Sequence, residues 1–130
     1  MILLDTHVVI WLASDDSRIS RPARSAIAEA RQSRRGLAIS DFTLFELSLL
    51  FGKKKFALAV TPEAFLSEVE RRFTVFPVTA NIALQAFDLS ARFPNDPVDR
   101  ILAATALIED IPLVTADREI RRSQAVSTIW

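Results

Sequence analysis

Short apolar segments alternate with helix-forming segments along this chain, and that alternation limits its possible folds more than any other feature. We expect strands at five apolar or β-branched runs: residues 2–4, 37–40, 73–78, 112–115 and 126–130. Strands that alternate with helices form a parallel sheet with helices on both faces. The sequence therefore predicts an α/β fold with a short, mostly parallel sheet. It contains no internal repeat and no linker, so residues 1–130 are expected to form a single domain.

Capping residues and prolines mark the starts of the predicted helices. Ser20 and Thr61 each precede a proline-containing first turn, and Thr79 precedes another helical segment. Helices are expected over residues 6–13, 21–34, 41–51, 62–72, 80–92 and 96–109, with a helical turn at 117–122. Gly36 and Gly52 are suited to end two of these helices.

Composition excludes several kinds of site. Two glycines in the whole chain are too few for either glycine-rich phosphate loop, and the absence of cysteine excludes disulfides, thiolate zinc sites and cysteine nucleophiles. One histidine excludes a multi-histidine metal centre. Sixteen basic residues balance sixteen acidic ones, so nucleic acid would be bound only by local charged patches. If the protein binds a catalytic metal, its ligands must be carboxylates.

The first residues do not resemble a secretion signal. Asp5 interrupts the apolar run that a signal peptide needs, and no basic run precedes it. No apolar stretch is long enough to span a bilayer. We therefore expect a cytoplasmic protein with no membrane contact.

Four acidic residues lie in apolar surroundings. Asp5 and Asp117 directly follow predicted strands, Glu46 lies inside an apolar helix, and Asp99 precedes the apolar run 101–108. An unpaired buried carboxylate is costly, and neighbouring like charges raise that cost. A cluster of such groups therefore needs a cation, and Mg²⁺ or Mn²⁺ prefers oxygen ligands.

Each acid also has a purely structural interpretation. Asp5, Asp96 and Asp117 stand where a helix could use them as an N-cap. Asp96 and Asp99 have nearly the spacing of a capping box. Glu46 has no helix start to cap, so its alternative is a buried salt bridge to one of the arginines.

Four motifs occur in a fixed order along the chain: LDTHVVIWL at 4–12, Ser40 with FEL at 45–47, NDPVDRILAATA at 95–106, and LVTAD at 113–117. Together they resemble the PIN-domain ribonucleases, in particular the VapC toxins of toxin–antitoxin pairs. The resemblance covers essentially the whole chain and implies a PIN-like fold.

The resemblance also implies hydrolysis of RNA phosphodiesters by metal-activated water, with Mg²⁺ or Mn²⁺ as cofactor. It places the acidic quartet of the family at four positions: Asp5, Glu46, Asp99 and Asp117. We expect Asp5 and Asp99 to be direct metal ligands, completed by the other two acids. The supporting residues are expected to be Thr6, Asp96 and Thr115, whose side chains can orient water or a carboxylate.

The same resemblance implies a homodimer and a cognate VapB-like antitoxin. Arg100 and Arg118 flank site acids, and we predict that they contact the RNA backbone. The six arginines of residues 18–35 are interpreted as a solvated helix face, and Lys53–Lys55 as a solvated loop. His7 and Trp11 are interpreted as scaffold and core residues rather than as a general base and a base-stacking platform.

Three other functional classes were compared with the same sequence. A haloacid-dehalogenase-type phosphatase needs a second aspartate two residues after the first, where this chain has His7. A receiver domain needs paired early acids and a lysine after a late strand, but the late strand here is followed by residues 116–118, Ala-Asp-Arg, and all three lysines lie at 53–55. The remaining alternative is a catalytically silent PIN module that acts through protein or RNA contacts. The presence of all four acids favours an active enzyme.

Overall fold

The computed structural model describes residues 1–54 and 58–130. Within these ranges, five strands form one sheet in the order β3-β2-β1-β4-β5, and every neighbouring pair is parallel. The strands are β1 (Ile2–Leu4), β2 (Leu37–Ser40), β3 (Thr74–Phe76), β4 (Leu113–Val114) and β5 (Thr128–Ile129). In the register of the sheet, Leu3 of β1 pairs with Ala38 on one side and with Leu113 on the other. The prediction of a short parallel sheet is confirmed.

Seven α-helices and one 3₁₀ turn connect and cover these strands in the described residues. They are α1 (Thr6–Ser14), η1 (Asp16–Arg18), α2 (Arg21–Gln32), α3 (Asp41–Gly52), α4 (Pro62–Arg72), α5 (Ala80–Asp88), α6 (Pro97–Ile108) and α7 (Arg118–Ser123). The side chains of Ser20, Thr61 and Thr79 each accept a hydrogen bond from a backbone N–H in the first helical turn, as predicted. Lys53 and Lys54 are exposed as expected, whereas Lys55 of that predicted loop lies outside the described residues.

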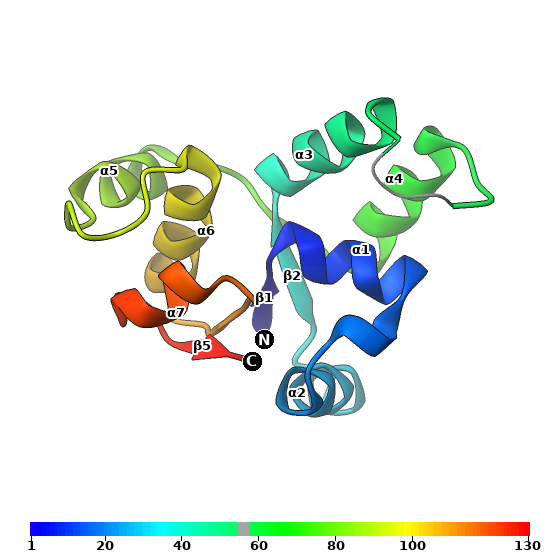
Figure 1. The fold of residues 1–130 in the computed structure, drawn as a ribbon, viewed down its shortest axis with the longest axis horizontal. Coiled ribbons are helices and arrows are strands. Elements are labelled where there is room, and N and C mark those ends of the chain that lie inside the picture. Colours follow the sequence, from blue (N-terminus) through cyan, green and yellow to red (C-terminus); the bar gives the residue numbers. More distant parts are fainter. Residues whose placement is uncertain (55–57) are drawn as a thin grey trace.

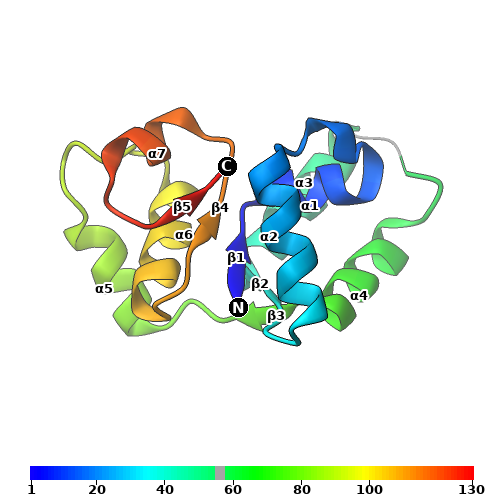
Figure 2. The same cartoon turned by 90° about the horizontal axis from the view of Figure 1, so that it is seen from below.

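The two faces of the sheet carry separate hydrophobic cores. Ile2 and Leu4 of β1 pack with residues of α1, α2, α3 and α4, whereas Leu3 between them packs with residues of α6 and α7. Figures 1 and 2 show these two helix groups on opposite sides of the central strands, with α5 lying outside α6. Helices on both faces explain why the strands are continuous apolar runs rather than alternating ones.

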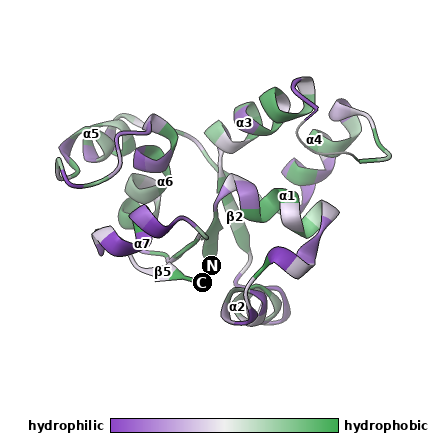
Figure 3. Cartoon of the chain, in the orientation of Figure 1, coloured by the Kyte–Doolittle hydropathy of each residue, from purple (hydrophilic) through white to green (hydrophobic). Residues whose placement is uncertain are grey.

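The hydropathy of the residues agrees with this arrangement of a central sheet between two groups of helices. The central strands are hydrophobic in Figure 3, whereas α7 at the outside is largely hydrophilic. Leu3, Leu4 and Ile39 are completely buried. Every helix in the described ranges falls short of the length and apolar character needed to cross a membrane.

Helix α5 ends earlier than the sequence predicts. It stops at Asp88 rather than Arg92, because Leu89 adopts an extended backbone and turns into the core, followed by Phe93. Arg100 of α6 stabilises this end. Its guanidinium donates hydrogen bonds to the carbonyl oxygens of Ala86, Phe87, Leu89 and Pro94. The last carbonyls of a helix lack partners within that helix, and Arg100 supplies them.

These contacts predict a large loss of stability when Arg100 is shortened. Arg100→Ala should lower the free energy of unfolding by about 2 kcal/mol, because several helix-end carbonyls lose a charged donor. Urea denaturation measures this change. Arg100→Lys should recover only part of the loss, because an ammonium does not reproduce the planar fork. Arg92→Ala, at an exposed position, is the matched control. Equal midpoints for Arg100→Ala and the wild type would show that the contacts contribute nothing.

Candidate active site

The order of the strands fixes where a site can form. From the central strand β1 the chain moves outward through β2 and β3, then returns to the other side of β1 with β4 and β5. In open α/β sheets, ligands bind beyond the carboxyl ends of the strands where the winding reverses. Here that point lies between β1 and β4. Asp5 follows β1 directly, and Thr115 follows β4.

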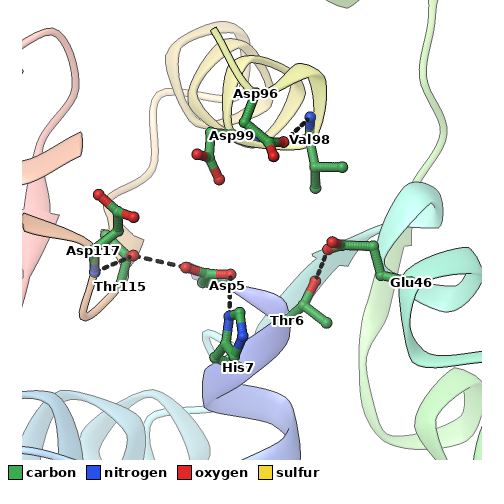
Figure 4. A network of polar contacts seen from close by, with 9 residues as sticks. All are labelled: Asp5, Thr6, His7, Glu46, Asp96, Val98, Asp99, Thr115 and Asp117. Atoms are coloured by element: carbon green, nitrogen blue, oxygen red, sulfur yellow. Dashed lines mark hydrogen bonds and ion pairs between the residues drawn. The ribbon is translucent and has the colours of Figure 1, made fainter. Parts of the chain in front are cut away.

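An open cavity of about 360 Å³ lies at this edge of the sheet. It is lined by Asp5, His7, Trp11, Glu46, Asp96, Asp99, Ala116 and Asp117. Figure 4 shows the acidic side chains around a common space, carried by the ends of β1 and β4, by α3, and by the start of α6. The structure thus brings together all four acids that the sequence singled out, with Asp96 beside them.

Asp5 is buried, with 8% of its surface exposed. Its carboxylate accepts a hydrogen bond of 2.7 Å from the Thr115 hydroxyl, which in turn accepts one of 3.0 Å from the Asp117 backbone N–H. Although Asp5 occupies the N-cap position of α1, its side chain caps no backbone N–H of that helix. Burial raises the pKa of the Asp5 carboxyl above its ordinary value. The hydrogen bond from Thr115, rather than a helix cap, is therefore the principal contact of this aspartate.

Glu46 projects from α3 toward the cavity and is half-buried. Its carboxylate accepts a hydrogen bond from the hydroxyl of Thr6, which is almost completely buried in the first turn of α1. Burial, followed by the nearby charge of Asp5, raises the pKa of Glu46. Within residues 1–54 and 58–130, no arginine pairs with Glu46, so its interpretation as half of a buried salt bridge is wrong.

Asp96 and Asp117 do cap helices. Oδ1 of Asp96 accepts the backbone N–H groups of Val98 and Asp99 at the start of α6. Oδ1 of Asp117 accepts the N–H groups of two residues that begin α7. Each cap uses one carboxylate oxygen, and both residues also line the cavity. Capping and a role in the site are therefore compatible at these positions.

Asp99 is a strongly perturbed carboxyl group of the site. It lies in the first turn of α6, and in the described chain no hydrogen bond or ion pair reaches its carboxylate. Burial first, and then the charges of Asp96 and Asp5, raise the pKa of Asp99 to about 7. The folded protein thus holds negative charge here that its own side chains do not balance. Perturbed carboxyl groups in a cavity are characteristic of functional sites.

Carboxylate oxygens are the donors that Mg²⁺ and Mn²⁺ prefer, so the donor set fits a hard divalent ion by its chemistry. The side chains surround the cavity without converging on one point. Among the residues that the structure describes, no group of three or more His, Cys, Asp or Glu side chains is close enough to hold an ion. Metal binding would therefore have to draw these side chains together, and the positive charge of the ion would offset the repulsion felt by Asp99.

The two arginines predicted to contact RNA have different surroundings. Arg118 is exposed at the start of α7, beside Asp117. Arg100 instead turns away from the cavity to the end of α5, where four backbone carbonyls engage its guanidinium. This placement does not support the predicted RNA contact of Arg100, and it differs from that of Asp99 because adjacent residues on a helix point about 100° apart.

His7 and Trp11 line the cavity, although the sequence interpretation assigned them to scaffold and core. The His7 side chain is 66% exposed, and its Nδ1 lies 4.0 Å from a carboxylate oxygen of Asp5. Trp11 is half-buried and also packs against the hydrophobic core, as the sequence predicted. The sequence signal for this position is their spacing of four residues in the helix that follows Asp5, because that spacing puts both side chains on one helix face.

Fold and site together define an α/β domain with a carboxylate-lined cavity at the switch point of its sheet. Comparison with known proteins agrees. The family model of the PIN domain matches residues 2–125. Ribonuclease VapC22 of Mycobacterium tuberculosis is 33% identical over 131 residues, which cover 99% of this chain and 98% of that protein. The chain therefore belongs to the PIN-domain family, and within it to the group of VapC ribonucleases.

Solved structures show the same fold. DNA-bound VapBC from Salmonella typhimurium aligns with a TM-score of 0.69 and 25% identity, covering 98% of this chain and 97% of the other. A toxin–antitoxin complex from Klebsiella pneumoniae aligns with a TM-score of 0.64 and 23% identity over the same shares. The expectation of a PIN-like fold is confirmed.

The raised pKa of Asp99 predicts a pH-dependent stability. A carboxyl whose pKa rises from 3.8 to about 7 on folding binds its proton more tightly in the folded chain. Its contribution to stability is complete below the ordinary pKa and is lost as the pH rises toward 7. In EDTA at pH 8, Asp99→Asn should therefore melt about 3–5 °C above the wild type, a figure that allows for solvent screening of a half-exposed group.

At pH 5 the two melting temperatures should lie closer together, because the wild-type carboxyl is then protonated. Thermal melts at both pH values measure the change. Glu70→Gln, at an exposed site on α4, is the control and should alter the melting temperature little at either pH. A gap between Asp99→Asn and wild type that does not depend on pH would contradict the electrostatic interpretation.

Proposed function

We propose that this chain is a metal-dependent endoribonuclease and the toxin of a VapBC-type toxin–antitoxin pair. The observation that carries the proposal is the convergence of Asp5, Glu46, Asp99 and Asp117 on one cavity with unbalanced negative charge. Membership of the VapC group gives RNA as the substrate class. The presence of all four acids favours an enzyme over a catalytically silent binding module. We further propose that residues 1–130 form one PIN domain.

In this proposal, Asp5 and Asp99 bind Mg²⁺ or Mn²⁺ directly, and Glu46 and Asp117 complete the ligand shell. When bound, the ion lowers the pKa of a water molecule and offsets negative charge on the reacting phosphate. Thr115 holds the carboxylate of Asp5 by its hydrogen bond.

The remaining residues position that shell. Thr6 holds Glu46 in the same way as Thr115 holds Asp5, so each of these two acids has one oxygen fixed in place. Asp96 fixes the first turn of α6 and thereby the place of Asp99. Arg118, exposed beside Asp117, is the arginine that we retain as an RNA-backbone contact.

The partners proposed are a VapB-like antitoxin and a second copy of this chain. The related structures from Salmonella typhimurium and Klebsiella pneumoniae contain VapBC and a toxin–antitoxin complex, respectively. A basic antitoxin side chain placed among the acids of the cavity would neutralise the charge that otherwise attracts a metal ion. Such a contact would inhibit the enzyme by competing with its cofactor.

The direct test is cleavage of a panel of structured RNAs by purified protein with Mg²⁺ or Mn²⁺. We expect cleavage that EDTA abolishes and that Asp99→Asn reduces by more than about 100-fold, since even outer-shell changes at metal sites cost 10–100-fold. Glu70→Gln should cleave at the wild-type rate. Equal cleavage by wild type and Asp99→Asn would remove Asp99 from the site. RNA binding without any cleavage would favour the silent binding module.

Thr115 provides a second test. Thr115→Val keeps the shape of this buried side chain but removes the hydroxyl that holds Asp5, so the rate of cleavage should fall by about 10–100-fold. Thr115→Ser retains the hydroxyl and should stay within a few-fold of the wild type. Cleavage rates at saturating metal measure both. If the valine and serine variants were equally active, the hydrogen bond would have no part in positioning Asp5.

A further inference from the structure

One wall of the acidic cavity is aromatic rather than acidic. His7 and Trp11 of α1 line the cavity beside Asp5, and their ring centroids lie 6.1 Å apart with a tilt of 45°. Figure 4 shows His7 on the first turn of α1, next to Asp5 and away from Asp99 and Glu46. We call His7 and Trp11 the aromatic wall. It adjoins the acids to which the proposed function assigns the chemistry.

Two further side chains hold the Trp11 ring. The ring of Trp130 lies 5.7 Å from it between centroids at an angle of 52°, and the guanidinium carbon of Arg18 lies 4.6 Å from its centroid. Arg18 is exposed, and in the part of the chain that the structure describes it has no carboxylate partner. The wall is therefore fixed in orientation and carries a positive charge over the Trp11 ring.

Core packing alone does not account for this arrangement. The buried face of α1 is formed by Val8, Val9 and Ile10, each at most 8% exposed. Trp11 is only partly buried, and the His7 side chain is largely exposed. An exposed imidazole and a half-buried indole, four residues apart on one helix face, present ring surface to the cavity.

The negative charge of the cavity explains why an aromatic surface beside it would help to bind RNA. Five acids line it, so the phosphates of an RNA chain are repelled before any metal binds. Substrate affinity must then come from groups other than the acids themselves. Base stacking on aromatic rings together with arginine contacts to phosphate is how proteins bind single strands without reading their sequence.

We propose that the aromatic wall is a nucleotide subsite, in which a base of single-stranded RNA stacks on His7 and Trp11 while Arg18 contacts a neighbouring phosphate. The inference rests on the proposed ribonuclease function and adds to it the side of the cavity along which the RNA strand runs. Trp11 is then a substrate-positioning residue that also packs against the core. Because every base has a π-face, the subsite is tolerant of sequence.

The test is equilibrium binding of a short single-stranded RNA in EDTA, where cleavage cannot occur. Trp11→Leu should weaken binding about 5- to 50-fold, the range typical for loss of one stacked base, whereas Trp11→Phe should retain most of the affinity. Leu84→Ala, at an exposed apolar position on α5, should bind like the wild type. Against an oligonucleotide that lacks the stacked base, Trp11→Leu and wild type should bind alike.

Fluorescence supplies a readout that a folding defect cannot imitate. In Trp130→Phe, Trp11 is the sole tryptophan, since the chain has two. Stacking should quench its emission, and the base-free oligonucleotide should not. If Trp130→Phe binds RNA with Trp11 unquenched, or if Trp11→Leu binds RNA as tightly as the wild type, the subsite is overturned and the ribonuclease proposal stays intact. A wild type that neither binds nor cleaves RNA overturns both.

Discussion

The position of β1 between β2 and β4 is the constraint on which the rest of the molecule depends. Parallel pairing on both sides brings the carboxyl ends of three strands to one edge of the sheet. It is this pairing that lets Thr115 reach Asp5 across 110 residues of sequence. A three-residue strand can do so because both of its faces are covered by apolar helices, which hold it at the centre. The cavity is thus a consequence of sheet order: Asp5 and Asp117 follow strand ends, and α3 and the start of α6 bring the other acids to the same edge.

The site also shows how one side chain can serve both folding and chemistry. Asp96 and Asp117 each satisfy the free N–H groups at the start of a helix with a single oxygen, so these helices begin where the cavity needs them. Asp5 and Asp99 cap nothing. Asp5 is held by a hydroxyl, and Asp99 has a pKa raised to about 7 by burial and by its acidic neighbours. Burying these two carboxylates without a cation lowers the stability of the folded chain. The same burial gives a site that favours binding of a cation.

Much of this could be predicted from local sequence. Strand runs, the capping residues Ser20, Thr61 and Thr79, and the association of the four acids all follow from periodicity, caps and the topology of parallel sheets. What could not be predicted depends on contacts between distant segments. The partner of Glu46 is Thr6, on a different helix, and the early end of α5 depends on Arg100. The place of Arg100 could not be predicted, because being next to Asp99 in sequence does not put it on the same side of α6. The core position expected for Trp11 is partly confirmed, since it packs against the core, but its second position at the cavity could not be predicted from apolar neighbours alone.

The attachment of Arg100 to the end of α5 reaches beyond stability. Asp99 and Arg100 are consecutive on α6, so α6 cannot turn about its own axis without detaching the guanidinium from the carbonyls of Ala86 and Leu89. The direction in which Asp99 points is therefore set by a helix that contributes no side chain to the cavity wall. Helix α5 thus restrains the rotation of α6 about its axis, and this restraint keeps the carboxylate of Asp99 directed into the cavity.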